Sequence, residues 1–93
     1  MILIKNGRVI DPKSQRDENI DLIIKENKIY KIGKFDESDE YEKIIDASGN
    51  VVAPGLVDVH VHFRDPGFTY KEDIESGAKS AARGGFTTVI CMA

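Results

Sequence analysis

Short bursts of apolar residues separated by polar turns open the chain, a pattern typical of β-strands. Asn6-Gly7 interrupts the first burst, "ILIKNGRVI". Both residues tolerate the positive φ that a type I′ turn requires, so we expect a hairpin over Ile2–Ile10. The polar stretch from Asp11 to Asn19 begins with Asp11-Pro12, which predicts a loop.

Further short strands are expected before residue 54. The segment "IDLIIKENKIYKIG" predicts a strand pair that turns at Glu26-Asn27. The acidic stretch Lys34–Glu42 lacks a clean period, and we interpret it as a solvated connection rather than an acidic binding face. The expected strands are Ile20–Lys25, Lys28–Ile32, Lys43–Asp46 and Asn50–Ala53. Residues 1–53 are therefore predicted to form a small β unit.

The pattern changes after Pro54-Gly55. Leu56–Phe63 predicts a strand, "TYKEDIESGAKSAARGG" a helix of roughly thirteen residues, and "FTTVICMA" a second strand. Thr69 is the expected N-cap, with Glu72 three residues later completing a capping box. Gly84-Gly85 is expected to end the helix. Strand, helix and strand in this order predict a βαβ unit with a parallel strand pair.

Polar residues occupy alternate positions of the Leu56–Phe63 strand and the residue after it. Side chains alternate between the two faces of a strand, so these residues are expected to share one face. The polar set is Asp58, His60, His62 and Arg64, and the apolar set is Val57, Val59, Val61 and Phe63. The apolar set is expected to pack beneath the helix, because a charge in an apolar core costs several kcal/mol unless it is paired.

The polar set contains the elements of a metal and anion site. Histidines at i and i+2 can direct ring nitrogens at one metal ion, although a hydrogen-bonded structural histidine beside an exposed one fits the same pattern. Asp58 is placed to accept a hydrogen bond from an imidazole N–H behind the metal. The Arg64 guanidinium suits a substrate carboxylate, or alternatively pairs with Asp65.

Composition narrows the function classes. The 93 residues have a net charge of −3, which argues against electrostatic binding of nucleic acid or anionic membranes. The lone Cys91 forms no internal disulfide, which suits a reducing compartment. Neither a signal peptide nor a membrane-spanning run is evident, so a cytoplasmic location is expected.

The run "PGLVDVHVHFRDPGFTYKEDIESGAKSAARGGFTTVICMA" resembles the start of the barrel in the amidohydrolase superfamily, and specifically the dihydroorotase family. The resemblance rests on Pro-Gly, Asp-x-His-x-His-x-Arg, Asp-Pro-Gly and Gly-Gly-Phe-Thr-Thr. It implies an α/β fold, with residues 54–93 forming the first βαβ unit of a (β/α)₈ TIM barrel after a partial β-subdomain at residues 1–53.

The same resemblance implies a site that binds Zn²⁺, with one or two ions in the complete enzyme. His60 and His62 would be metal ligands, and Arg64 together with His62 would contact dihydroorotate or N-carbamoyl-aspartate in pyrimidine biosynthesis. Zinc lowers the pKa of bound water towards about 7, which suits hydrolysis of a cyclic amide near neutral pH. The general-base Asp is expected beyond Ala93, so the 93-residue chain alone is expected to be inactive.

Two alternatives stay open. One is an allantoinase or dihydropyrimidinase on the same scaffold, although these generally lack arginine at the position matching Arg64. The other is a non-catalytic fragment or interaction module. The expected macromolecular partners are the remainder of the enzyme or a second copy of the chain.

Overall fold

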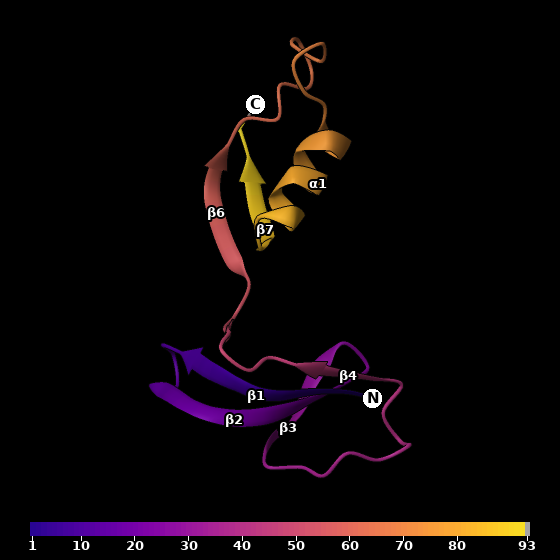
Figure 1. Cartoon of the computed structure of the whole chain (residues 1–93). Helices are drawn as coiled ribbons and strands as arrows, with labels where there is room; N and C mark the ends of the chain where they lie inside the picture. Colours follow the sequence, from indigo (N-terminus) through magenta and orange to yellow (C-terminus); the bar gives the residue numbers. More distant parts are fainter. Residues whose placement is uncertain (93) are drawn as a thin grey trace. The chain divides into compact units, whose positions relative to one another are not determined.

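The computed structural model describes residues 1–92 and shows mostly strands with one helix (Figure 1). The elements are β1 (Ile2–Asp11), β2 (Arg16–Lys25), β3 (Lys28–Gly33), β4 (Lys43–Asp46), β5 (Val51–Val52), β6 (Leu56–Val61), α1 (Ile74–Arg83) and β7 (Phe86–Cys91). They form two compact units, Met1–Pro54 and a second that begins at Gly55. Ala93, the last residue of the predicted final strand, lies outside the described residues.

The first unit is a sheet built around β1. The strand order is β3-β2-β1-β4, and β5 also pairs with β1. β1 and β3 run antiparallel to β2, whereas β4 and β5 run parallel to β1. The buried apolar side chains of this unit are Leu3, Val9, Leu22, Ile23 and Ala47. Full burial of a leucine or isoleucine contributes roughly 1.5–3 kcal/mol, so this small core holds the central strands together.

The predicted hairpin over Ile2–Ile10 is wrong, because β1 continues through Asn6-Gly7 as one strand. The register between β1 and β2 shifts between Ile4 and Gly7, which marks a β-bulge, and Asn6 adopts a φ of 64° there. A residue with a left-handed backbone conformation is typical of β-bulges as well as of turns. A Cβ at Gly7 would lie 2.6 Å from Cγ2 of Val52, so the glycine also permits close packing against β5.

The loop predicted from Asp11 to Asn19 is shorter than expected, because β2 already begins at Arg16. The polar side chains there are accommodated at the surface of the ladder, where the Arg8 guanidinium donates to both carboxylate oxygens of Asp17 at 2.8 Å. The second hairpin is confirmed: β2 and β3 pair antiparallel, and Glu26 and Asn27 have φ of 53° and 61°. Two positive φ values in a row define the type I′ geometry.

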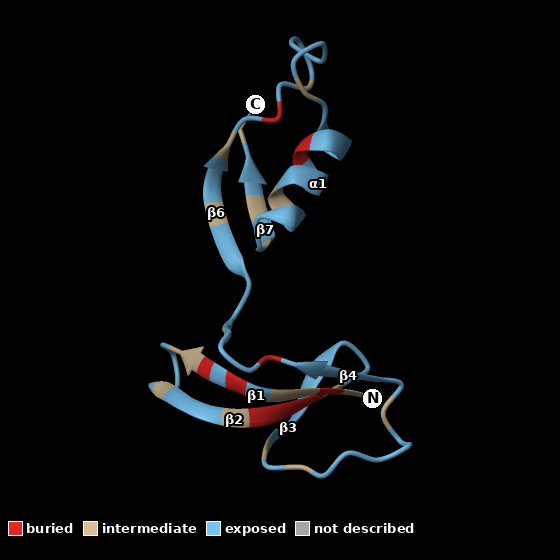
Figure 2. Cartoon of the chain, viewed as in Figure 1, coloured by how far each residue is buried: buried red, intermediate tan, exposed pale blue. Residues whose placement is uncertain are grey.

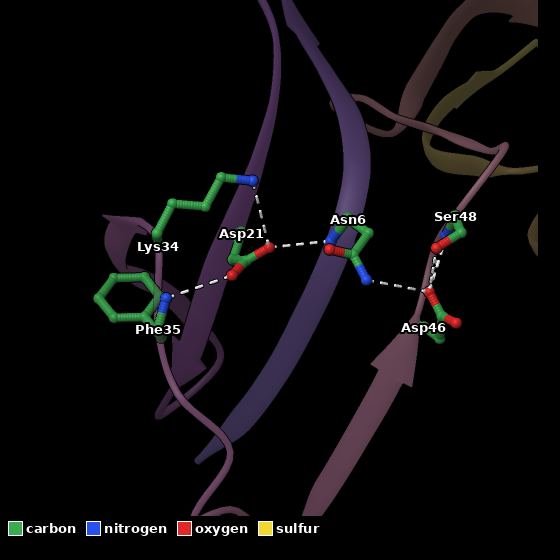
Figure 3. A network of polar contacts seen from close by, with 6 residues as sticks. All are labelled: Asn6, Asp21, Lys34, Phe35, Asp46 and Ser48. Carbon is green, nitrogen blue, oxygen red and sulfur yellow. Dashed lines mark hydrogen bonds and ion pairs between the residues drawn. The ribbon is translucent and has the colours of Figure 1, made fainter.

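A buried carboxylate opposite the bulge fixes the local backbone (Figure 3). Asp21 is 2% exposed. Its Oδ1 accepts the main-chain N–H of Asn6 at 2.9 Å, and Oδ2 accepts that of Phe35 at 3.2 Å. Burial raises the pKa of this carboxyl, but the two N–H donors and the positive charges of Lys34 and Lys5 outweigh burial and lower its pKa overall.

The second unit confirms the predicted βαβ order, with β6 and β7 pairing in parallel. The main-chain N–H of Leu56 donates to the carbonyl of Gly85 at 2.9 Å. A Cβ at Gly55 would collide with the side chain of Thr87. The Pro-Gly and Gly-Gly-Phe-Thr-Thr segments are therefore in contact, which gives Gly55 a steric role at the start of β6.

The helix begins later than predicted. Its N-cap is Asp73 rather than Thr69, and its capping partner is Ser76 rather than Glu72. Asp73 Oδ1 accepts the main-chain N–H of Ser76 at 2.7 Å, while the N–H of Asp73 donates to Ser76 Oγ. Thr69 instead lies in the turns that connect β6 to α1. The predicted end is confirmed, because Gly84 caps α1 and Gly85 has a φ of 90°.

Candidate metal and substrate site

The candidate site lies where β6 ends, and the predicted alternation of faces holds for His60 and His62, whose rings converge, but not along the whole strand. Asp58 pairs with Val89 and Val61 with Cys91, so three residue steps on β6 oppose two on β7. This extra residue makes a bulge, which changes the side to which later side chains point. Strict alternation places Asp58 and Val61 on opposite faces, yet both line one cavity on the helix side.

The apolar set consequently does not pack as one face. Val57 and Val59 are 59% and 64% exposed, whereas Phe63 is 7% exposed. β6 also ends at Val61, two residues earlier than predicted. His62 and the two residues after it thus belong to the connection to α1 rather than to the strand.

The two histidines converge despite the irregular strand. Nε2 of His60 and Nε2 of His62 are 3.2 Å apart, and the ring planes meet at 67°. Two nitrogens bound to a tetrahedral zinc ion at 2.0–2.1 Å are separated by roughly 3.3–3.4 Å, so this spacing fits a pair of ligands on one ion. Alternatively, the N–H of one ring donates to the unprotonated nitrogen of the other ring, and either histidine can be the donor. Residues 1–92 contain no cluster of three potential metal-binding side chains.

Asp58 contacts the main chain rather than an imidazole. Its Oδ1 accepts the N–H of His60 at 3.0 Å. A carboxylate that accepts an N–H two residues later fixes the backbone locally, in the way of an Asx turn. Asp58 therefore orients His60 through its peptide, and not through the ring N–H for which the sequence suggested it.

Arg64 follows the histidines in a constrained backbone conformation. Its φ is 69°, and its carbonyl accepts the N–H of Phe68 at 2.9 Å. The side chain is exposed, and within residues 1–92 its guanidinium forms no ion pair, so the alternative pairing with Asp65 is not observed. The guanidinium is available to bind an anion. Asp65-Pro66-Gly67 forms the turn expected from the sequence.

A cavity of about 250 Å³ lies between the end of β6, β7 and α1. Its walls include His62, Phe63, Glu72 and Gly77. The sequence placed Glu72 in a helix cap and Gly77 within the predicted helix, among small residues. The signal for Gly77 was its place among small residues, but its partner Phe63 could not be identified without the fold.

Comparisons with known proteins agree with the motifs. A family model described as Dihydro-orotase-like matches residues 49–93. Dihydroorotases of Lactococcus lactis and Streptococcus pneumoniae are 64% and 59% identical over 99% and 100% of this chain. The chain spans 22% of the length of each of these relatives.

The fold resembles solved hydantoinase structures. An L-hydantoinase (dihydropyrimidinase) from Arthrobacter aurescens matches 98% of the chain with a TM-score of 0.83 and 35% identity, the chain covering 20% of it. A D-hydantoinase (dihydropyrimidinase) from Thermus sp. matches 99% with a TM-score of 0.79 and 35% identity, again over 20% of its length. The fold of this chain thus resembles a segment of hydantoinase-type amidohydrolase structures.

Within that class, the sequence is similar to dihydroorotases over almost its whole length, and residues 49–93 match the Dihydro-orotase-like family. Residues 1–92 include no helix that is both long and apolar enough to cross a membrane.

Proposed function

We propose that this chain forms the amino-terminal part of a zinc-dependent dihydroorotase. The complete enzyme interconverts dihydroorotate and N-carbamoyl-aspartate by hydrolysis or closure of the ring amide. The observation that carries the proposal is the 3.2 Å separation of the His60 and His62 ring nitrogens, followed by Arg64, whose guanidinium forms no ion pair with the described residues. The 64% identity to the Lactococcus lactis dihydroorotase supports the choice of substrate.

Each site residue has a distinct role in this proposal. His60 and His62 hold the metal through their ring nitrogens, and Asp58 orients His60 through its peptide N–H. Arg64 binds the carboxylate of the substrate, with which a guanidinium forms two parallel hydrogen bonds, and His62 also contacts the substrate in this proposal. When bound, zinc supplies an activated water and polarises the carbonyl. A carboxylate outside this chain exchanges the proton.

We further propose that β6, α1 and β7 are the first elements of a (β/α)₈ barrel. Catalytic groups of such barrels lie at the carboxyl ends of the strands, which is where His62 and Arg64 follow β6. The strands expose Leu56, Val57, Val59 and Ile90. Large apolar side chains exposed together on a parallel strand pair fit a sheet that continues into further strands and helices.

A second candidate is a hydantoinase or dihydropyrimidinase, which the structural resemblance favours. The identities favour the dihydroorotase, since the two hydantoinases are 35% identical to this chain and the dihydroorotases 59–64%. Arg64 gives a chemical criterion. Dihydrouracil is dihydroorotate without its carboxylate. A guanidinium therefore strengthens the binding of dihydroorotate but not that of dihydrouracil.

The test is substrate preference in the complete polypeptide that carries this chain. We expect kcat/KM for dihydroorotate to exceed that for dihydrouracil by at least about 100-fold, because a charged hydrogen-bonded pair contributes roughly 1.5–3 kcal/mol and the pocket adds to it. Arg64→Gln should remove most of this preference. A wild-type preference for dihydrouracil or hydantoin would support the second candidate instead.

A further inference from the structure

The backbone of Gly77 in α1 lies close to the ring of Phe63, because a Cβ built at Gly77 would collide with ring atoms. Phe63 is the buried large apolar side chain of this unit within the described residues, and Gly77 is the buried residue of α1 (Figure 2). A Cβ at position 77 would lie 2.8 Å from Cε1 of Phe63 and 2.7 Å from Oε1 of Glu72. Real Cβ atoms do not approach other atoms within 3.0 Å, so an alanine here would displace the ring.

Phe63 lies between the two side chains proposed to contact metal and substrate. β6 ends at Val61, whose carbonyl accepts the N–H of Met92 at 2.8 Å. Beyond that bond the chain leaves the sheet, and the next main-chain bond after it is the one from Phe68 to the carbonyl of Arg64. Between these two main-chain hydrogen bonds, the buried ring of Phe63 holds the chain in place.

We propose that Gly77 is a positioning residue for the site. The absence of a side chain at Gly77 allows Phe63 to pack against α1, and the packed ring fixes the directions of His62 and Arg64 on either side. This inference deepens the proposed function and rests on it for its kinetic part. Gly77 touches neither metal nor substrate and acts through Phe63.

The first test is a double-mutant cycle in the complete polypeptide, combining Gly77→Ala with Phe63→Val, which lacks the ring atoms that an added methyl group would meet. Gly77→Ala should raise the KM for dihydroorotate by about tenfold, because displacements near 1 Å cost up to about 100-fold. In the Phe63→Val background the same change should alter KM by less than about twofold. An undiminished effect in that background would overturn the proposal.

Gly84→Ala, at the C-cap of the same helix, is the matched control. A Cβ at position 84 would lie 3.5 Å from the carbonyl oxygen of Ala81, an ordinary contact, and the φ of −84° suits any residue. This variant should leave KM unchanged. If Gly84→Ala raised KM as much as Gly77→Ala, a general effect of substitutions in this helix would explain the result, and the proposal would be overturned.

The second test does not depend on turnover. In protein labelled with ¹⁵N-histidine, the ring signals of His62, assigned with His62→Gln, should shift in Gly77→Ala and stay in place in Gly84→Ala. Should Gly77→Ala fail to fold, Phe63→Leu is expected to shift the same signals. A lowered Tm with unmoved His62 signals overturns the proposal. A wild-type protein without dihydroorotate turnover refutes the proposed function, while the His62 signals still decide the role of Gly77.

Discussion

The main-chain N–H of Asn6 donates to Oδ1 of Asp21 at 2.9 Å, joining the bulge of β1 to the buried centre of β2. The other carboxylate oxygen of Asp21 holds the main chain at Phe35. One side chain thus satisfies two main-chain donors that regular strand pairing leaves free. Buried polar groups are costly when unpaired, so this contact connects the irregular backbone to stability.

Asp21→Asn in the complete polypeptide is expected to lower the free energy of unfolding of the part containing the β unit by roughly 1–3 kcal/mol, because the amide offers one acceptor where the carboxylate offers two. Urea unfolding, with amide hydrogen exchange in β1 and β2 as the readout, measures this loss of stability. Asp17→Asn, at an exposed ion pair with Arg8, is the control and should change little. Equal losses in both variants would contradict a special role for Asp21.

Acid should reduce the contribution of Asp21. Its pKa is lowered in the folded state, because the N–H donors and lysine charges outweigh the effect of burial. Its contribution is therefore complete above the unfolded pKa of about 3.9 and is lost as the pH falls through the lower folded value. The stability difference between wild type and Asp21→Asn should shrink below about pH 4 in unfolding curves measured from pH 7 to pH 2. A difference that grows on acidification would contradict this sign.

Gly7→Ala should destabilise the β unit by about 1–3 kcal/mol, since the added methyl group would lie 2.6 Å from Cγ2 of Val52. Thermal unfolding measures the loss. Gly7→Ala combined with Val52→Ala removes the obstructing atom, and in that background the added methyl group should cost little. An equal cost in both backgrounds would show that the Val52 contact is not the cause.

Arg64→Ala should raise the KM for dihydroorotate while zinc content stays near that of wild type, because the proposed function assigns the guanidinium to the substrate and the imidazoles to the metal. Steady-state kinetics and metal analysis of the same preparations separate the two effects. His60→Ala is the contrasting variant and should lose zinc. Loss of zinc in Arg64→Ala would instead indicate a structural role for the arginine.

The isolated 93-residue chain should not hydrolyse dihydroorotate. Its two histidines offer an incomplete ligand set, and residues 1–92 contain no cluster of three potential metal-binding side chains. A sensitive assay of rigorously purified chain with added zinc measures this. Zinc-dependent turnover that co-purifies with the chain would contradict the prediction. A monodisperse chain that melts cooperatively but lacks turnover would show that folding and activity are separable.

Local sequence chemistry determined several elements of this protein. The positive φ at Glu26 and Asn27 fixed the β2–β3 hairpin, and Gly84 and Gly85 ended α1 where expected. The motif of two histidines and an arginine pointed to a metal and carboxylate site. These features depend on residues close in sequence, whose conformational preferences operate without distant partners.

Only the tertiary structure decided where regular patterns break. Asn6-Gly7 suits both a turn and a bulge, and β1 continues as a strand because β2, β4 and β5 pair with it on both sides of that point. The bulge in β6 is likewise set by its register with β7, which places Asp58 and Val61 along one cavity. The contact between Phe63 and Gly77 joins residues fourteen positions apart, and it exists only once α1 packs against the sheet. Strand pairing and packing choose among conformations that the local sequence leaves nearly equal in energy.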